Sequence, residues 1–149
     1  PKKTYLKILG WVIPAAIIAA IAASFTVNPD MGWSQIKSWV LVNGTLSGLG
    51  ALLAGGHPLS ILVAFIAAPI TSLNPLLAAG WFAGLTEAAL RKPKVEDFDN
   101  LATDLNSYRG FIHNRVTRIL LVVIMSNLGS SIGTFVSGFG IFKSLLDRL

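Results

Sequence analysis

The sequence contains no cysteine, which excludes a disulfide framework and thiol chemistry. Charged residues are also scarce, at 13% of the 149 residues against about 25% in ordinary soluble domains. No charged side chain occurs between residues 8 and 29, 38 and 86, or 119 and 142. Together with 53% hydrophobic residues and a mean hydropathy of +0.66, these gaps predict an integral membrane protein with several spans.

The predicted fold class is all-α, a polytopic helical membrane bundle. Open sheet edges cannot face lipid, and a barrel needs short alternating strands, whereas this chain has long runs of Ala, Leu, Ile and Gly. A span takes about 20 residues, so the apolar runs predict four to five membrane segments in a single transmembrane domain over residues 1–149.

Three spans are predicted over residues 7–26, 34–54 and 115–142, with Trp33 and Trp39 at a membrane interface. Asn28-Pro29-Asp30 is expected to stop the first, and the turn at Gly55-Gly56 to end the second. A cleavable signal peptide is an alternative for residues 1–25, but its apolar part is too long. Because the sequence begins without Met, we expect a fragment or a processed product.

Residues 59–90 contain breaks at Pro69 and at Asn74-Pro75, which predict a Pro-broken helical hairpin with two segments of about 22 Å each. The hairpin is either re-entrant or made of two short tilted spans, and the sequence leaves both open. Apolar residues at helical spacing between 95 and 112 predict one cytoplasmic amphipathic helix at the interface.

The basic residues predict the orientation in the membrane. Three Lys or Arg precede the first span, one lies between 28 and 37, six lie between 91 and 118, and two follow residue 142. The positive-inside rule therefore places the N-terminus and residues 91–118 in the cytoplasm and the C-terminus outside. The net charge of +5 fits this orientation, and we expect no nucleic acid partner.

Polar residues inside apolar runs predict a polar pocket between helices. They are Asn43, His57, Thr71, Ser72, Asn74 and Asn127. Either they serve as interhelical hydrogen bonds or they hold a substrate or ion. Glu87 and Arg91, at helical i,i+4 spacing, predict an ion pair at the cytoplasmic boundary, with a proton or cation site as the alternative.

Three GxxxG patterns predict close helix packing. They are Gly44 with Gly48, Gly80 with Gly84, and Gly129 with Gly133. The packing is either within one chain or across a homodimer, for which Gly129 and Gly133 are the candidate seam.

No P-loop, HExxH, GxSxG or CxxC pattern occurs, so we expect no catalytic residue and no cofactor. The two histidines, His57 and His113, lack metal-ligand spacing, so we expect no metal. A further hypothesis is intramembrane catalysis by His57 or Glu87, which predicts peptide cleavage by this chain alone.

Several distinctive strings are distributed over the chain, namely WVLVNG at 39–44, HPL at 57–59, APITSLNP at 68–75, LRKPKV at 90–95, NRVTRILL at 114–121 and SNLGSSIGT at 126–134. In these strings the chain resembles the C-terminal membrane region of prokaryotic members of the TraB/PrgY (pheromone shutdown) family. The resemblance implies a preceding soluble domain, similar to Tiki and GumN metallopeptidase-like domains with GxxH and ExxR signatures. Gly110 to His113 spells GxxH but has no ExxR companion, so no catalytic role is transferred.

The family is associated with limiting sensitivity to peptide pheromones. The resemblance therefore implies a membrane domain that anchors and orients a peptidase-like soluble domain involved in peptide inactivation or sequestration. Its expected partners are the lipid bilayer of a prokaryotic cytoplasmic membrane, its own N-terminal domain, a second copy in a homodimer, and a peptide. The rival hypothesis is a transporter or channel module for a small solute or peptide, based on the interrupted helices over 59–90.

Overall fold

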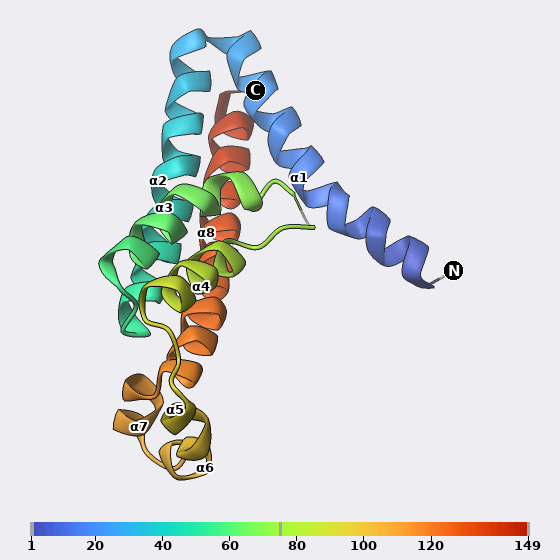
Figure 1. Cartoon of the computed structure of the whole chain (residues 1–149). Coiled ribbons are helices and arrows are strands. Elements are labelled where there is room, and N and C mark those ends of the chain that lie inside the picture. Colours follow the sequence, from blue (N-terminus) through green and yellow to red (C-terminus); the bar gives the residue numbers. More distant parts are fainter. Residues whose placement is uncertain (1, 75, 149) are drawn as a thin grey trace.

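The computed structural model describes residues 2–74 and 76–148, and the side chains of residues 108, 111 and 112 lie outside the description. Every regular element within those residues is a helix, which confirms the all-α prediction (Figure 1). The helices are α1 (Lys2–Val27), α2 (Pro29–Leu53), α3 (Pro58–Thr71), α4 (Ala79–Leu90), α5 (Val95–Asp99), α6 (Leu101–Asp104), α7 (Tyr108–His113) and α8 (Arg115–Arg148).

Three of these helices, α1, α2 and α8, are long and apolar enough to cross a membrane. Helices α3 and α4 have 14 and 12 residues, so they are about 21 and 18 Å long, less than a hydrocarbon core of about 30 Å. The count of four to five membrane segments stays a prediction.

Helix α2 begins earlier than predicted, because the stop signal of α1 is also the start signal of α2. The side chain of Asn28 accepts a hydrogen bond from the amide of Asp30 (2.8 Å), and Pro29 occupies the first helical position. Residues 29–33, which the sequence analysis left between the first two spans, are therefore helical. Helix α1 begins at Lys2 instead of residue 7, and its N-terminal half leaves the bundle (Figure 1).

The bundle is built on α2 and α8, which run antiparallel. Gly50 lies against Met125, Leu46 against Gly129, and Asn43 against Gly133. Helix α3 packs on α2 and α4 packs on α8, so the two short helices form a hairpin beside the central pair. Buried alanines from α2, α3 and α4 surround Val122 of α8, which allows close approach of all four helices.

Pro69 does not break α3, contrary to the prediction, but lies inside its last turns. The carbonyl of Pro69 is one of the terminal acceptors of the helix, and the indole Nε1 of Trp39 donates to it (3.0 Å). This bond also corrects the prediction that Trp39 marks a membrane interface, because Trp39 is only 3% exposed. The second predicted break falls partly on Pro75, which lies outside the described residues.

The single amphipathic helix predicted between 95 and 112 is wrong, because the structure has three short helices there. The chain turns at Asn100, and Ser107 is extended and caps α7 by accepting from the amide of Gly110 (3.0 Å). Such polar residues stabilise helix ends better than helix interiors. This segment, α5–α7, lies at the end of the molecule opposite the C-terminus (Figure 1).

Helix α8 runs six residues beyond the predicted end at Phe142, because no glycine or proline follows that residue to stop it. Its first turn is held by Asn114, whose side-chain oxygen accepts from the amide of Val116 (2.9 Å). The side-chain amide nitrogen (Nδ2) of Asn114 donates to the backbone carbonyl of Asp97 (2.6 Å) and to the carboxylate of Asp104 (2.9 Å). A single buried side chain thus ties α5 and α6 to α8.

Candidate functional site: a polar interior

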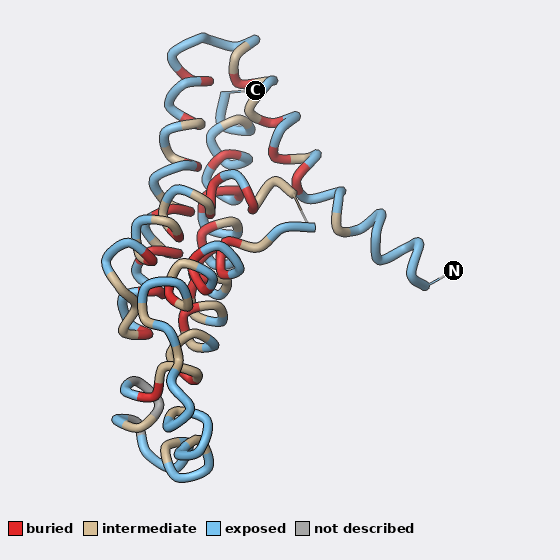
Figure 2. The backbone as a smooth tube through the Cα atoms, in the orientation of Figure 1, coloured by how far each residue is buried: buried red, intermediate tan, exposed pale blue. Residues whose placement is uncertain are grey.

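The buried positions lie where the helices face one another (Figure 2), and they include many polar residues, while many large hydrophobic side chains are exposed. The exposed side chains include Leu85 (69%), Phe135 (71%) and Phe139 (73%). The buried polar residues are Ser24, Gln35, Asn43, Ser47, Ser60, Thr71, Glu87, Asn114, Thr117, Ser126, Ser130 and Ser137. A soluble protein has the reverse distribution, whereas helices in lipid place their polar groups toward one another.

Asn43 lies at the centre of this interior, near the middle of α2. Its side-chain oxygen accepts from the hydroxyls of Ser72 (3.0 Å) and Thr134 (3.2 Å), and its side-chain nitrogen donates to the backbone carbonyl of Trp39 (3.1 Å). Ser72 and Ser130 also share a hydrogen bond (2.8 Å). The cluster therefore joins α2, α8 and the tip of the α3–α4 hairpin in a single hydrogen-bonded network. The tip is the connection that begins at Ser72, directly after α3.

A cavity of about 310 Å³ adjoins this cluster at the hairpin tip. Four of the six residues predicted to form a polar pocket line it, namely Thr71, Ser72, Asn74 and Asn127. Asn127 accepts from the backbone amide of Gly80 (2.8 Å) and so caps α4 from across the bundle. Asn74 instead accepts from the amide of Leu76 (3.0 Å) within its own turn.

His57 is placed away from these residues, at the opposite end of α3. Its Nδ1 accepts from the amide of Leu59 (3.1 Å), which caps that helix. The predicted polar pocket is thus divided between the hairpin tip and the hairpin base.

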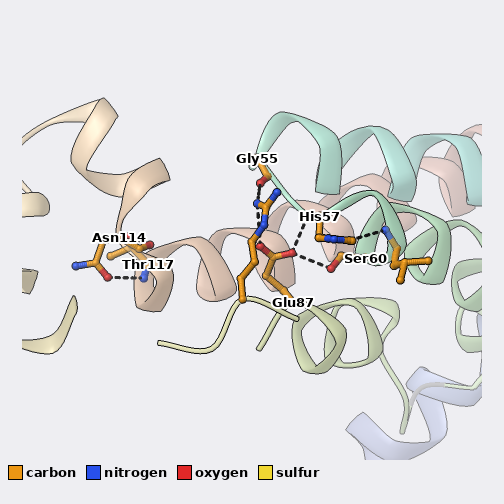
Figure 3. A network of polar contacts seen from close by, with 8 residues as sticks. Gly55, His57, Ser60, Glu87, Asn114 and Thr117 are labelled. Carbon is orange, nitrogen blue, oxygen red and sulfur yellow. Dashed lines mark hydrogen bonds and ion pairs between the residues drawn. The ribbon is translucent and has the colours of Figure 1, made fainter. Parts of the chain in front are cut away.

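The hairpin base is the end at which α3 begins and α4 ends. Its polar contacts centre on Glu87 (Figure 3), which is completely buried. One carboxylate oxygen accepts from the backbone amide of His57 (2.7 Å) and from the hydroxyl of Ser60 (2.8 Å). The other oxygen forms an ion pair with Arg91 (3.3 Å), and Arg91 also donates to the carbonyl of Gly55 (2.9 Å). A carboxylate at the N-terminus of α3 is also favoured by the helix dipole.

The sequence analysis missed Ser60 as a partner of Glu87. The signal is present, since Ser60 is the third residue of α3 and short polar residues commonly occupy first turns. Nothing in the sequence pairs Ser60 with a residue 27 positions further along the chain.

The six glycines of the GxxxG patterns all face neighbouring helices of the same chain. A β-carbon at Gly44 would lie 2.7 Å from the carbonyl of Phe65, and one at Gly133 would lie 2.9 Å from the α-carbon of Asn43. Gly48 faces Ile61, Gly80 and Gly84 face Val123, and Gly129 faces Leu46. Because these faces are occupied within one chain, a homodimer would need another surface, and the homodimer stays a prediction.

Three long apolar helices around a polar interior define the class of protein, a helical membrane-associated protein. The family model described as the TraB family protein, C-terminal domain, matches residues 5–146. The chain therefore belongs to the TraB family, which confirms the resemblance seen in its sequence.

An uncharacterised protein of Methanocaldococcus jannaschii is 38% identical over 139 residues, covering 90% of this chain and 35% of that protein. The chain thus spans about a third of the length of this relative. No solved structure matches.

Proposed function

We propose that this chain is the integral membrane domain of a longer protein, and that it anchors and orients a peptidase-like soluble domain at a prokaryotic cytoplasmic membrane. The observation that carries the proposal is the distribution of polarity, with apolar side chains outside and hydrogen-bonded polar groups inside. The greater length of the relative, of which this chain covers 35%, leaves room for another domain. The soluble domain acts on a peptide pheromone by cleavage or sequestration, as the family resemblance implies.

The proposed topology has three full spans and a re-entrant hairpin made of α3 and α4. The base of the hairpin is closed by Glu87 and Arg91, and its tip bonds to Asn43 and Ser130 near the middle of the two long helices α2 and α8. Both short helices are too short for a span. With the basic end inside, the N-terminus and α5–α7 are cytoplasmic and the C-terminus is outside.

The anchoring proposal is tested by joining a fluorescent protein ahead of residue 1 and expressing the fusion in bacteria. We expect the fusion in the membrane pellet after carbonate washing, with the fluorescent protein inaccessible to protease added outside intact cells. Release by carbonate contradicts membrane integration, and digestion from outside contradicts the orientation.

The role as an anchor is tested in the whole protein by replacing residues 1–149 with unrelated helices of the same topology. If this region only positions the soluble domain, the replacement retains most of the protection against peptide pheromone. A complete loss with normal membrane insertion means that this region does more than anchor.

The re-entrant hairpin is tested with single cysteines at Thr71, Ser72 and Asn74, since the chain has no cysteine of its own. In oriented proteoliposomes we expect labelling by a water-soluble maleimide from the cytoplasmic side. Labelling only from the outside supports two full spans and contradicts the hairpin.

A second candidate function is passage of a small uncharged solute. It is favoured by the cavity at the hairpin tip, whose lining includes Asn74, Asn127 and Ser131 and, among the described residues, no charged side chain. We expect the purified chain to speed the equilibration of glycerol or urea in stopped-flow light scattering of liposomes, and Asn127→Leu to reduce the rate. Rates equal to those of empty liposomes contradict the transport function and leave the anchor function in place.

A further inference from the structure

Three arginines lie close together at the basic end of the bundle, beside the hairpin base. Arg91 donates to the carbonyl of Gly55 in the turn between α2 and α3 (2.9 Å), and Arg115 donates to the carbonyl of Lys92 (3.0 Å). Arg118 lies one turn before Val122 on α8, and Val122 contacts the same turn at Gly56. Arg91 thus bonds to the turn between α2 and α3, whereas Arg115 bonds to Lys92, and both arginines lie within electrostatic reach of Arg118.

The acidic groups near this cluster do not neutralise it. Arg118 is within electrostatic reach of Arg91, Arg115, Glu87 and Asp97. Glu87 is already paired with Arg91, with the backbone amide of His57 and with the hydroxyl of Ser60. Asp97 accepts from the backbone amides of Lys94 (2.7 Å) and Arg115 (3.5 Å). Neither carboxylate forms an ion pair with Arg118 in the part of the chain that the structure describes.

Arg118 also carries an unsatisfied donor. Its Nε is buried and has no hydrogen-bond partner among the described residues. Buried nitrogen donors in proteins are almost always paired, so an unpaired one next to excess positive charge indicates a missing anionic acceptor. A guanidinium group presents donors in a fork that matches the oxygens of a phosphate.

The surroundings of the cluster are apolar and exposed. Leu53 at the end of α2 is 59% exposed, and Leu90 next to Arg91 is 45% exposed. In the proposed topology these side chains face acyl chains at the cytoplasmic boundary. A molecule with both a phosphate group and acyl chains fits this combination better than a soluble phosphate.

We propose that Arg118, together with Arg91 and Arg115, binds the phosphate of an anionic phospholipid at the cytoplasmic face of the bundle. The inference rests on the proposed membrane domain and goes beyond it, since anchoring needs no particular lipid. A lipid bound here bridges α8 and the turn between α2 and α3, and so holds the base of the hairpin against the central pair.

The test titrates the chain, purified in a neutral detergent, with phosphatidylglycerol or phosphatidylcholine and counts retained lipids by native mass spectrometry. We expect phosphatidylglycerol to be retained preferentially, and Arg118→Gln to weaken its apparent affinity about five- to tenfold. Arg118→Lys keeps the charge but loses the Nε donor, so we expect its apparent affinity for phosphatidylglycerol to lie between that of the unchanged chain and that of Arg118→Gln. The matched control is Arg109→Gln, which replaces an exposed arginine of α7 at the same end of the bundle. We expect this variant to leave the apparent affinity for phosphatidylglycerol unchanged.

Insertion of each variant into phosphatidylcholine nanodiscs, checked by size-exclusion chromatography, separates a failure of this proposal from a failure of the membrane domain. If Arg118→Gln does not fold, Arg118→Lys and Arg115→Gln carry the test. Equal retention of the two lipids, or an equal loss in Arg109→Gln, overturns the proposal. Retention of inorganic phosphate without phosphatidylglycerol assigns the arginines to a soluble ligand and overturns the lipid assignment.

Discussion

Glu87 is tolerated in an apolar bundle because every part of its charge has a partner. The backbone amide of His57, the hydroxyl of Ser60 and the guanidinium of Arg91 replace the water that the carboxylate loses on burial. Ion pairs of this kind add little stability compared with a well-packed apolar pair, but breaking one partner leaves the other uncompensated. Arg91 is 32% exposed, so the cost of breaking the pair is reduced by solvent.

Glu87→Gln is therefore expected to destabilise the bundle by about 1–3 kcal/mol, less than the roughly 3–5 kcal/mol of a fully buried pair, because Arg91 is partly exposed. The measurement is the midpoint of thermal unfolding in detergent, which we expect to fall by about 3–10 °C. Glu96→Gln, on the exposed face of α5, is the matched control. Equal midpoints for the two variants would show that the buried pair contributes nothing.

Asn43 and Asn74 are the same residue type in different environments, which makes them a matched pair. Asn43 bonds to three residues from α2, α8 and the hairpin tip, whereas Asn74 bonds only within its own turn. Hydrogen bonds between membrane helices average about 0.6 kcal/mol, so Asn43→Ala is expected to cost about 1–2 kcal/mol. Asn74→Ala should lower the unfolding midpoint much less, and a larger effect at Asn74 would contradict the network.

At the scale of the elements, the contact between α2 and α8 depends on the absence of side chains. Gly50 and Gly129 each place their α-carbon against backbone of the partner helix, where a β-carbon would clash with a carbonyl group. Backbone atoms cannot move aside as a flexible side chain can, so these positions tolerate little substitution. The hydroxyl of Ser47 then reaches the carbonyl of Ser126 (3.0 Å) across the same contact.

Gly129→Val is expected to separate α2 from α8 and to cost at least about 3 kcal/mol, the upper range for overpacked sites. Gly140→Val is the control in the same helix, since nothing lies within 4 Å of the space that its β-carbon would occupy. The measurement is the fraction of monodisperse protein in size-exclusion chromatography after detergent extraction. Similar profiles for the two variants would refute the packing role of Gly129.

At the scale of the whole molecule, the two ends of the bundle carry different charge and different connections. The connection between α1 and α2 lies near the C-terminus (Figure 1). Residues of the connection and of the end of α8, Asn28 and Arg148 among them, line a common cavity of about 420 Å³. Helix α8 has 34 residues and is about 51 Å long, so it extends well beyond a hydrocarbon core of about 30 Å. Segment α5–α7 lies against its other end.

Single cysteines at Asp30 and Asp147 are therefore expected to react with an impermeant maleimide from the same side of the membrane. A cysteine at Asp99 is expected to react only from the opposite side. Labelling of intact cells and of inverted vesicles gives the two sides separately. Reaction of all three positions from one side would contradict the arrangement of α2 and α8 as full spans.

The sequence by itself determined the helical class, the three long apolar helices, the GxxxG positions and the pairing of Glu87 with Arg91. These features depend on composition or on spacing within one helix, which the 3.6-residue period fixes locally. Only the tertiary structure decided that Trp39 is buried against Pro69 and that Asn43 meets Ser72 and Thr134. It also decided that the Nε of Arg118 is buried without a hydrogen-bond partner among the described residues. These contacts join residues far apart in the chain, and their geometry depends on how closely the glycine faces allow the helices to approach.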